Sequence, residues 1–222
     1  MIIEGNLLDL GFREYVQVWD LQRKLVDLRA RKVIPDTLIL VQHPHVFTVG
    51  KGVPGDAPTQ ISGIPVLRIE RGGQWTYHGP GQLVGYPILD LDTRQRNIHD
   101  FLRNIEETII LGLARFGINA VRRQGQTGVW VQSKKIASIG AAIRHWTTFH
   151  GFALNVNADL SYFGLIEPCG MPSSTMTSMR ALCGQEIDFN LVKKEIRRNF
   201  ESVFQLRLVE AEFERLATVA AS

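Results

Sequence analysis

Hydrophobic residues recur at helical spacing in three stretches of the chain. One stretch covers about 12–32, and a second covers about 98–116, where Asn97 precedes the first turn as a helix cap. The third begins near Asp188 and predicts one or two helices in a charged tail. The hydrophobic positions are Val18, Leu21, Leu25 and Leu28; Phe101, Leu102, Ile105, Ile109 and Leu113; and Phe189, Val192, Ile196, Phe200 and Val203.

Between these helices the chain contains short runs of β-branched and aromatic residues, separated by Gly and Pro, that predict strands. These runs are 37–42, 45–49, 65–69, 83–89, 128–132, 135–143 and 152–156. Helix and strand do not alternate regularly, so an α/β or α+β fold with a mixed sheet is favoured over a doubly wound parallel sheet. We expect a main domain over 1–179 and a small helical C-terminal lobe over 180–222.

The composition is typical of a folded protein in an aqueous environment. Of 222 residues, 45% are hydrophobic and 21% are charged, which is enough to bury a core and excludes a disordered protein. No apolar run is long enough to cross a membrane, and the N-terminus lacks the order of a signal peptide, so we expect a cytoplasmic protein. Cys169 and Cys183 are too few for a disulfide framework and are not spaced for structural zinc.

The formal net charge of +3 hides an uneven distribution. Six basic residues and no acidic one lie between Thr108 and Ala158, whereas the flanking segments are nearly neutral. Such a segment attracts an acidic partner, which includes nucleic acid, phosphate or an acidic protein, or it forms an ordinary solvated face. The basic residues are Arg115, Arg122, Arg123, Lys134, Lys135 and Arg144.

Several familiar motifs are absent or incomplete. Gly50, Gly52 and Gly55 match GxGxxG, but Pro54 and Pro58 follow where a dinucleotide-binding fold requires a helix. The chain has no GxxxxGK[ST], HExxH, GxSxG or SxxK motif. These absences remove the simplest sequence arguments for P-loop, zinc protease, α/β-hydrolase and Ser-Lys chemistry.

Three segments carry candidate chemistry. The stretch RGGQWTYHGPGQLVGYPIL, beginning at Arg71, combines glycines that let backbone approach a ligand with aromatic and histidine side chains, so it indicates either a pocket or a series of tight turns. In GLIEPCGMPSSTMTSM, Cys169 lies in a polar loop rather than an apolar run, which suits a reactive thiol if a neighbour removes its proton. Cys183 is more typical of packing.

The third segment is KKIASIGAAIRHWTTFHGFALNV, beginning at Lys134. Lys135 starts an otherwise apolar strand, a position that can desolvate the amine and allow proton exchange near neutrality. Both lysines could equally be exposed residues at a strand end.

Together these segments resemble the lipoyl(octanoyl) transferase family, in the order QHPHVFTVG, RGGQWTYHGPGQLVGYPILDL, GVWV, KIASIG, FHGFALNV and PCGMPSSTMTSM. The resemblance covers roughly Leu40 to Met179. The first block departs from the family, which commonly has an acidic residue and a second Pro where this chain has Gln42 and His45.

This resemblance implies a fold like that of biotin and lipoate protein ligases, with 1–179 as the catalytic domain. It also implies transfer of an octanoyl group from octanoyl-acyl carrier protein to a lysine of an apo lipoyl domain. Cys169 would carry the octanoyl group as a thioester, and Lys135 would exchange its proton. The thioester substrate is already activated, so neither ATP nor a metal or other cofactor is expected.

The same match implies a set of substrate-binding residues around the acyl chain and the phosphopantetheine arm. These are Arg71, Gly72, Gly73, Gln74, Trp75, Thr76, Tyr77, His78, Ser138, Ile139, Gly140, Gly151, Phe152 and Ala153. The implied partners are acyl carrier protein, the lipoyl domains of 2-oxoacid dehydrogenases and the glycine cleavage H protein, with the enzyme as a monomer and no role for nucleic acid or membrane. Because these partner families are typically acidic, Arg122, Arg123, Arg144 and Lys134 become candidates for electrostatic steering.

Three alternatives remain open at this point. An ATP-dependent lipoate or biotin ligase on the same scaffold would need no nucleophilic cysteine. A non-catalytic binding module for lipoyl domains or carrier proteins would tolerate loss of both Cys169 and Lys135. A cysteine-dependent thioesterase would release free acid instead of forming an amide.

Overall fold

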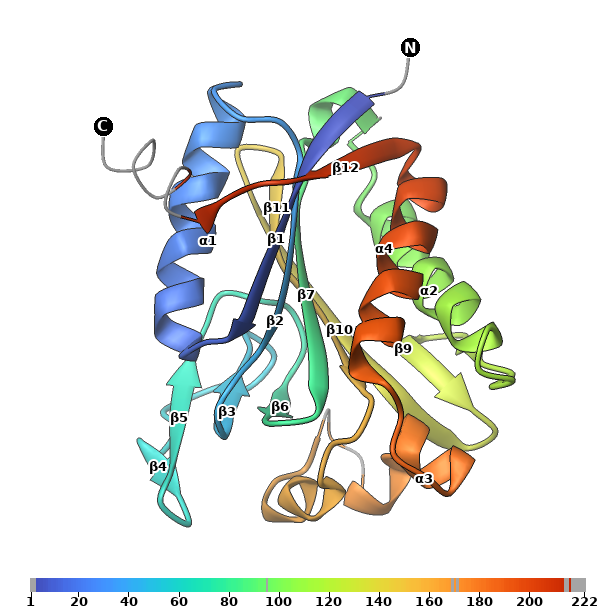
Figure 1. The fold of residues 1–222 in the computed structure, drawn as a ribbon. Helices are drawn as coiled ribbons and strands as arrows, with labels where there is room; N and C mark the ends of the chain where they lie inside the picture. Colours follow the sequence, from blue (N-terminus) through green and yellow to red (C-terminus); the bar gives the residue numbers. More distant parts are fainter. Residues whose placement is uncertain (1–2, 95, 169, 171, 214–215, 217–222) are drawn as a thin grey trace.

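A mixed sheet of eight strands forms the middle layer of the computed structural model, which describes residues 3–94, 96–168, 170, 172–213 and 216 (Figure 1). The strand order is β12-β1-β2-β7-β11-β10-β9-β8, with β1 parallel to β2 and β12 and the other neighbours antiparallel. Its strands are β1 (Ile3–Phe12), β2 (Thr37–Gln42), β7 (Gln82–Ile88), β8 (Val121–Arg123), β9 (Gln126–Val131), β10 (Lys134–Arg144), β11 (Thr147–Asn155) and β12 (Leu206–Glu210).

Helices cover both faces of this sheet (Figure 1). Helix α1 (Tyr15–Ala30) lies on one face, while α2 (Ile98–Ala114) and α4 (Phe189–Phe204) pack together on the other. The described residues also form a short α3 (Met179–Cys183) and 3₁₀ turns at Leu91–Arg94, Leu160–Leu165 and Ser173–Thr175. Among the described residues, no helix combines the length and apolar character that a membrane crossing requires.

Strand β2 shows why the sheet lies between two layers. Alternate residues of a strand point to opposite faces, and here both faces are apolar. Leu38 and Leu40 belong to the core under α2 and α4, whereas Ile39 and Val41 belong to the core under α1. The continuous hydrophobic run in this segment is therefore the pattern of a strand buried on both sides.

A second sheet of four strands lies beside one end of the large sheet (Figure 1). Its order is β4-β5-β3-β6, and Phe47, Val66, Tyr77 and Phe163 form its own small core. Its strands are β3 (Val46–Val49), β4 (Gln60–Ile61), β5 (Ile64–Arg68) and β6 (Trp75–His78). The small sheet places the glycine-rich segment after Arg71 against the large sheet.

The seven predicted strands are present within a few residues, and the mixed-sheet fold is confirmed. Asn97 caps α2 as expected, with its side chain accepting hydrogen bonds from the backbone N–H groups of His99 and Asp100. The first predicted helix began too early, because β1 continues to Phe12 and α1 starts at Tyr15.

The described part of the predicted C-terminal lobe shares the sheet and the core of the rest of the chain. Strand β12 pairs with β1, with Leu206 opposite Ile3 and Leu208 opposite Gly5. Val192, Ile196 and Phe200 of α4 join the same hydrophobic core as α2. The apolar alternation at 206 and 208 is too short to distinguish a strand from a helix end in sequence, which is why only helices were expected there.

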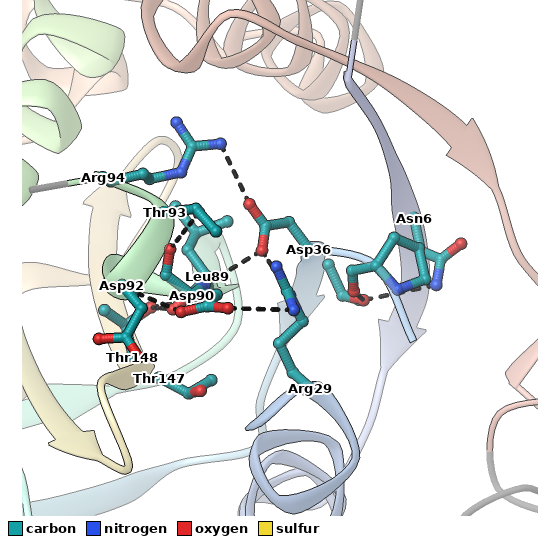
Figure 2. A network of polar contacts seen from close by, with 12 residues as sticks. Asn6, Arg29, Asp36, Leu89, Asp90, Asp92, Thr93, Arg94, Thr147 and Thr148 are labelled. Atoms are coloured by element: carbon teal, nitrogen blue, oxygen red, sulfur yellow. Dashed lines mark hydrogen bonds and ion pairs between the residues drawn. The ribbon is translucent and has the colours of Figure 1, made fainter. Parts of the chain in front are cut away.

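An ion-pair network joins α1, β2 and the turn after β7 at one edge of the fold (Figure 2). Asp36, 3% exposed, accepts hydrogen bonds from Arg29 Nε at 2.7 Å, Arg94 Nη2 at 3.0 Å and the backbone N–H of Asp90 at 3.0 Å. Arg29 Nη1 also lies 3.3 Å from Asp90 Oδ2, and Arg94 Nη1 donates to the carbonyl oxygen of Phe204 at the end of α4. The network therefore ties together elements that are distant in sequence.

Replacing Asp36 by Ala is expected to lower the free energy of unfolding by about 3–5 kcal/mol, because two half-buried guanidinium groups would lose the buried carboxylate that they share. Chemical denaturation would measure this loss of stability. Asp9→Ala is the control, because Asp9 forms an exposed ion pair with Lys193. A loss no greater than that of Asp9→Ala would contradict a structural role for the network.

Candidate active site

A narrow cavity of about 40 Å³ lies at the junction of α1, β6, β7, β10 and β11. We call it the acyl pocket, after the acyl chain that the sequence resemblance implies. Most of the substrate-binding residues expected from sequence line it. They are Arg71, Gly72, Gly73, Thr76, His78, Ser138, Ile139, Gly140, Gly151, Phe152 and Ala153.

Three expected residues lie elsewhere. Tyr77 is packed in the core of the small sheet, where its ring stacks on Tyr162 and its hydroxyl lies 2.8 Å from His45 Nδ1. Trp75 and Gln74 line a shallow depression beside Glu167 and Gly170. Alternation along β6 explains this arrangement, since Thr76 and His78 face the acyl pocket and the odd-numbered residues face away.

The structure adds three pocket residues that sequence reasoning missed: Tyr15, Tyr86 and His150. Tyr15 begins α1, and its position far along the chain from the recognised motifs gave no local signal. Tyr86 and His150 lie inside the quoted segments, but their residue types are also common in cores. Only the pairing of β7 with β11, and the packing of α1 over both, brings the three together.

Gly140 lets the loop at 71–73 close one side of the acyl pocket. The backbone N–H of Gly72 donates to the carbonyl oxygen of Ala141 on β10 at 3.0 Å. A Cβ at position 140 would lie 2.9 Å from the carbonyl oxygen of Gly72, which is too close for any larger residue without movement of the loop. Arg71 anchors the loop from the other side, since its Nη2 donates to the carbonyl and hydroxyl oxygens of Thr48 at 2.9 Å.

A second cavity of about 620 Å³, which we call the open groove, continues from the acyl pocket. The two share Gly72, Gly73, Ile139 and Gly140 as a common rim. The open groove is also bordered by Ile98 and Leu102 of α2, the turn at Gly125–Thr127 and Lys135 of β10. The acyl pocket extends from this rim towards β7 and α1.

Lys135 is buried, only 4% exposed, although it lines the open groove. Its Nζ lies 5.6 Å from the centre of the Trp130 ring, within the range of a cation–π interaction. Gly128 on the neighbouring strand makes room for it, because a Cβ there would collide with Lys135 Cε. The neighbouring Lys134 is exposed, so the lysine pair contains one desolvated and one solvated amine, as the strand position predicted.

Cys169 lies outside the described residues, but the residues on both sides of it are placed. Pro168 forms a β-bridge with Trp75, and a Cβ on Gly170 would lie 2.9 Å from Gln74 Oε1. Gln74 lines the open groove together with Lys135. Glu167 and Gly170 line a depression together with Trp75 and Gln74, and Gln74 lines both this depression and the open groove. The other cysteine, Cys183, is exposed at the end of α3 rather than packed as expected.

A line of buried amides connects the acyl pocket to the backbone of Lys135. His78 Nδ1 lies 3.3 Å from Gln82 Oε1, and Gln82 Nε2 donates to Asn155 Oδ1 at 2.9 Å. Asn155 Nδ2 donates to the carbonyl oxygen of Thr177, whose N–H donates to the carbonyl oxygen of Lys135 at 3.0 Å. These contacts fix the segment that follows Cys169 against β10 and β11.

The departure at Gln42 and His45 has a structural use. Gln42 Oε1 accepts a hydrogen bond from the N–H of Gly81 at 2.9 Å, so it supports the turn within HGPGQ. His45 contacts Tyr77 in the small sheet, as described above. Both residues therefore support the backbone around the acyl pocket without lining it.

Three buried histidines in and behind the acyl pocket are neutral at physiological pH. Burial lowers the pKa of His43 and of His150 from 6.5 to about 4, and it lowers the pKa of His78 well below its usual value. Burial also raises the pKa of the Tyr15 and Tyr86 hydroxyls. The tyrosine and histidine side chains that line the pocket are therefore neutral, with the charged Arg71 close to them.

These lowered values predict that the protein loses stability as the pH falls from about 6.5 to about 4. Below pH 6.5 the unfolded chain binds protons at these histidines, while the folded rings remain neutral until about pH 4, so stability is greatest above this window. We expect His43→Gln to flatten the pH dependence of the free energy of unfolding, and His99→Gln, at an exposed position, to leave it unchanged. Equal slopes for His43→Gln and wild type would contradict this assignment.

In the fold, acidic residues from other elements compensate part of the positive charge of the basic segment between Thr108 and Ala158. Arg122 pairs with Glu107 and lies 3.2 Å from Glu106 Oε2, and Arg144 Nη2 lies 2.5 Å from Asp27 Oδ1. The guanidinium of Arg123 lies over the Trp130 ring at 4.6 Å. Acidic residues of α1 and α2 thus compensate two of the steering candidates, which leaves Lys134 and Arg123 as the better ones.

Comparison with known proteins agrees with this arrangement. Residues 14–201 match the family model of the lipoyl protein ligase A/B catalytic domain. An octanoyltransferase of Syntrophotalea carbinolica is 44% identical over 90% of this chain and 94% of its own length. One from Caldanaerobacter subterraneus is 41% identical over 97% and 96%, respectively.

Solved structures show the same fold at low sequence identity. A bipartite lipoate protein ligase from Thermoplasma acidophilum matches with a TM-score of 0.70 and 19% identity over 99% of this chain and 91% of that one. A biotin protein ligase from Aquifex aeolicus matches with a TM-score of 0.55 and 13% identity over 91% and 70%, respectively. With matches to curated octanoyltransferases over nearly its whole length, this chain belongs to the lipoyl protein ligase A/B catalytic-domain family and, within it, to the octanoyltransferases.

Proposed function

We propose that this octanoyltransferase works through a covalent intermediate on Cys169, with Lys135 as the group that exchanges its proton. The donor is octanoyl-acyl carrier protein, and the acceptor is a lysine of an apo lipoyl domain. The observation that carries the proposal is that buried Lys135 borders a groove that shares its rim with a narrow pocket, while Pro168 and Gly170, the placed neighbours of Cys169, lie against Trp75 and Gln74.

In the first step, the Cys169 thiol gives its proton to the Lys135 amine, and the resulting thiolate attacks the carbonyl carbon of the octanoyl thioester. A bond forms between Cys169 Sγ and that carbon as the bond to the phosphopantetheine sulfur breaks. The departing thiolate takes the proton from the Lys135 ammonium. The step exchanges one thioester for another, so it needs neither ATP nor a redox cofactor.

In the second step, the amine of the acceptor lysine attacks the octanoyl-Cys169 thioester. A carbon–nitrogen bond forms and the bond to Cys169 Sγ breaks, which produces an amide and returns the cysteine to its thiol form. Lys135 relays the proton lost by the incoming amine. An amide is more stable than a thioester, so this step drives the sequence forward.

The two cavities suit the parts of these substrates. The acyl pocket is narrow and its lining is mostly apolar, which favours burial of the alkyl chain at about 0.8 kcal/mol per methylene. The open groove is wider, which suits a phosphopantetheine arm or a lysine side chain that must enter and leave. Lys135 borders the groove close to where the thioester carbonyl would lie.

The expected acceptors are the lipoyl domains of 2-oxoacid dehydrogenases and the glycine cleavage H protein, in the cytoplasm. Because carrier proteins and lipoyl domains are typically acidic, Lys134 and Arg123 would attract them over distances of about one Debye length.

The test is an ATP-free reaction of the full chain with octanoyl-acyl carrier protein and an apo lipoyl domain, followed by intact mass measurement of the lipoyl domain. The proposal expects one octanoyl group on the target lysine. A requirement for ATP would favour a ligase, and free octanoic acid without lipoyl-domain modification would favour a thioesterase. No reaction of any kind would favour a non-catalytic binding module.

A further inference from the structure

Part of the acyl pocket is lined by polar side chains that do not border the open groove. These are Tyr15, His78, Tyr86 and His150, and we call them the polar floor. They come from α1, β6, β7 and β11. This is an unusual wall for a pocket whose proposed ligand ends in a methyl group.

His150 is the least satisfied member of the polar floor. It is 1% exposed, and neither ring nitrogen makes a hydrogen bond with any described residue, although Nε2 lies 3.5 Å from Glu70 Oε2. Its backbone has a φ of 56°, a left-handed conformation that costs energy in a residue other than glycine. The N–H of His150 donates to Gln22 Oε1 at 2.7 Å, which holds the residue in place.

The tyrosine side of the polar floor is fixed from behind. Tyr86 OH lies 2.9 Å from His43 Nε2, and His43 Nδ1 lies 2.7 Å from the carbonyl oxygen of Arg13. The Tyr15 ring stacks on His78 at 5.5 Å between ring centres. These contacts prevent the polar groups from turning away to make space for an apolar chain.

We propose that the polar floor sets the longest acyl chain that the enzyme accepts. The proposal rests on the assignment of this cavity to the acyl group, made above. In a wholly apolar tunnel, each further buried methylene would improve binding about fourfold. Against the polar floor, a longer chain instead covers the His150 ring nitrogens, which make no hydrogen bond with the described residues, and lies against the Tyr15 and Tyr86 side chains, so each further methylene meets polar groups rather than apolar surface. Each added methylene therefore strengthens binding until the acyl chain reaches the polar floor, and weakens binding beyond it.

The test compares kcat/KM for transfer to an apo lipoyl domain from carrier-protein thioesters of six, eight, ten and twelve carbons. The main variant combines Tyr15→Phe with Tyr86→Phe, which removes two hydroxyls and keeps both rings. His150→Phe removes both ring nitrogens and is a second, independent variant. Tyr77→Phe is the matched control, because its hydroxyl lies in the small-sheet core outside the acyl pocket.

We expect wild type to prefer octanoyl, and both floor variants to raise the ratio of decanoyl to octanoyl kcat/KM at least fourfold, while Tyr77→Phe keeps the wild-type ratio. An unchanged ratio in folded floor variants would overturn the proposal while leaving octanoyl transfer itself intact. Absence of transfer by wild type would instead refute the proposed function. If the double variant fails to fold, the ratio of decanoyl to octanoyl kcat/KM is measured for Tyr15→Phe and Tyr86→Phe separately.

Discussion

Replacing Cys169 by Ala is expected to reduce octanoyl transfer by about 10⁴- to 10⁶-fold, because no other group would accept the acyl chain from the carrier protein. The acyl pocket and the open groove would remain, so octanoyl-acyl carrier protein should still bind with an affinity close to that of wild type. The measurement is single-turnover transfer to an apo lipoyl domain, together with the dissociation constant for the donor.

Cys183→Ala supplies the matched control, since it removes the other cysteine from an exposed position at the end of α3. It should transfer octanoyl at the wild-type rate. Substantial transfer by Cys169→Ala would mean that the lipoyl lysine attacks the carrier-protein thioester directly, and the covalent mechanism would then be wrong.

Replacing Lys135 by Met is expected to slow acylation of the enzyme by about 10²- to 10⁴-fold at neutral pH, because the thiol would lose the group that accepts its proton. Methionine fills a similar volume beside Trp130 and Gly128, so the fold should be preserved. The rate should recover as the pH approaches the ordinary thiol pKa of about 8.5, where the thiolate forms without help.

Lys134→Met is the control for this second prediction, because Lys134 is exposed and adjacent in sequence. It should leave acylation unchanged at low ionic strength with a small free thioester, although it could slow association with an acidic carrier protein. If Lys135→Met acylates at the wild-type rate at neutral pH, Lys135 has no part in proton transfer.

Much of the architecture could be predicted because the hydrophobic patterns were locally clear. The run at 37–42 matches β2 at both ends, and Asn97 was recognised as a cap from its residue type and position. Strand β1 was missed because Gly5 and Asn6 interrupt its apolar residues, and half of its positions are exposed. Its stability comes from pairing with β2 and β12, which lie far from it in sequence.

The candidate site was predictable where short motifs supplied both the backbone and the side chains. The loop at 71–73 and the strand segments at 138–140 and 151–153 line the acyl pocket as the resemblance implied. Tyr77 was included because it lies within the motif, yet alternation along β6 directs it to the other side. Tyr15 and His150 could not be found in this way, because their contribution depends on how α1 packs across β7 and β11.

The compensation of charged residues could not be predicted from the sequence either. A segment without acidic residues was expected to present a basic surface, but Arg122 and Arg144 are paired with Glu107 and Asp27 from distant helices. Sequence position reveals where charges lie along the chain, whereas their compensation depends on contacts between elements. The same applies to Asp36, whose partners Arg29 and Arg94 are brought together only by the fold.

The most direct test of the covalent mechanism is the intact mass of the enzyme after rapid mixing with octanoyl-acyl carrier protein in the absence of ATP and of any lipoyl domain. The mechanism predicts one octanoyl group per chain, located on the peptide that contains Cys169, retained in Cys183→Ala and lost in Cys169→Ala. It also predicts that an apo lipoyl domain removes the group and becomes octanoylated on lysine. An enzyme that remains unmodified while it transfers octanoyl at full rate would contradict the account.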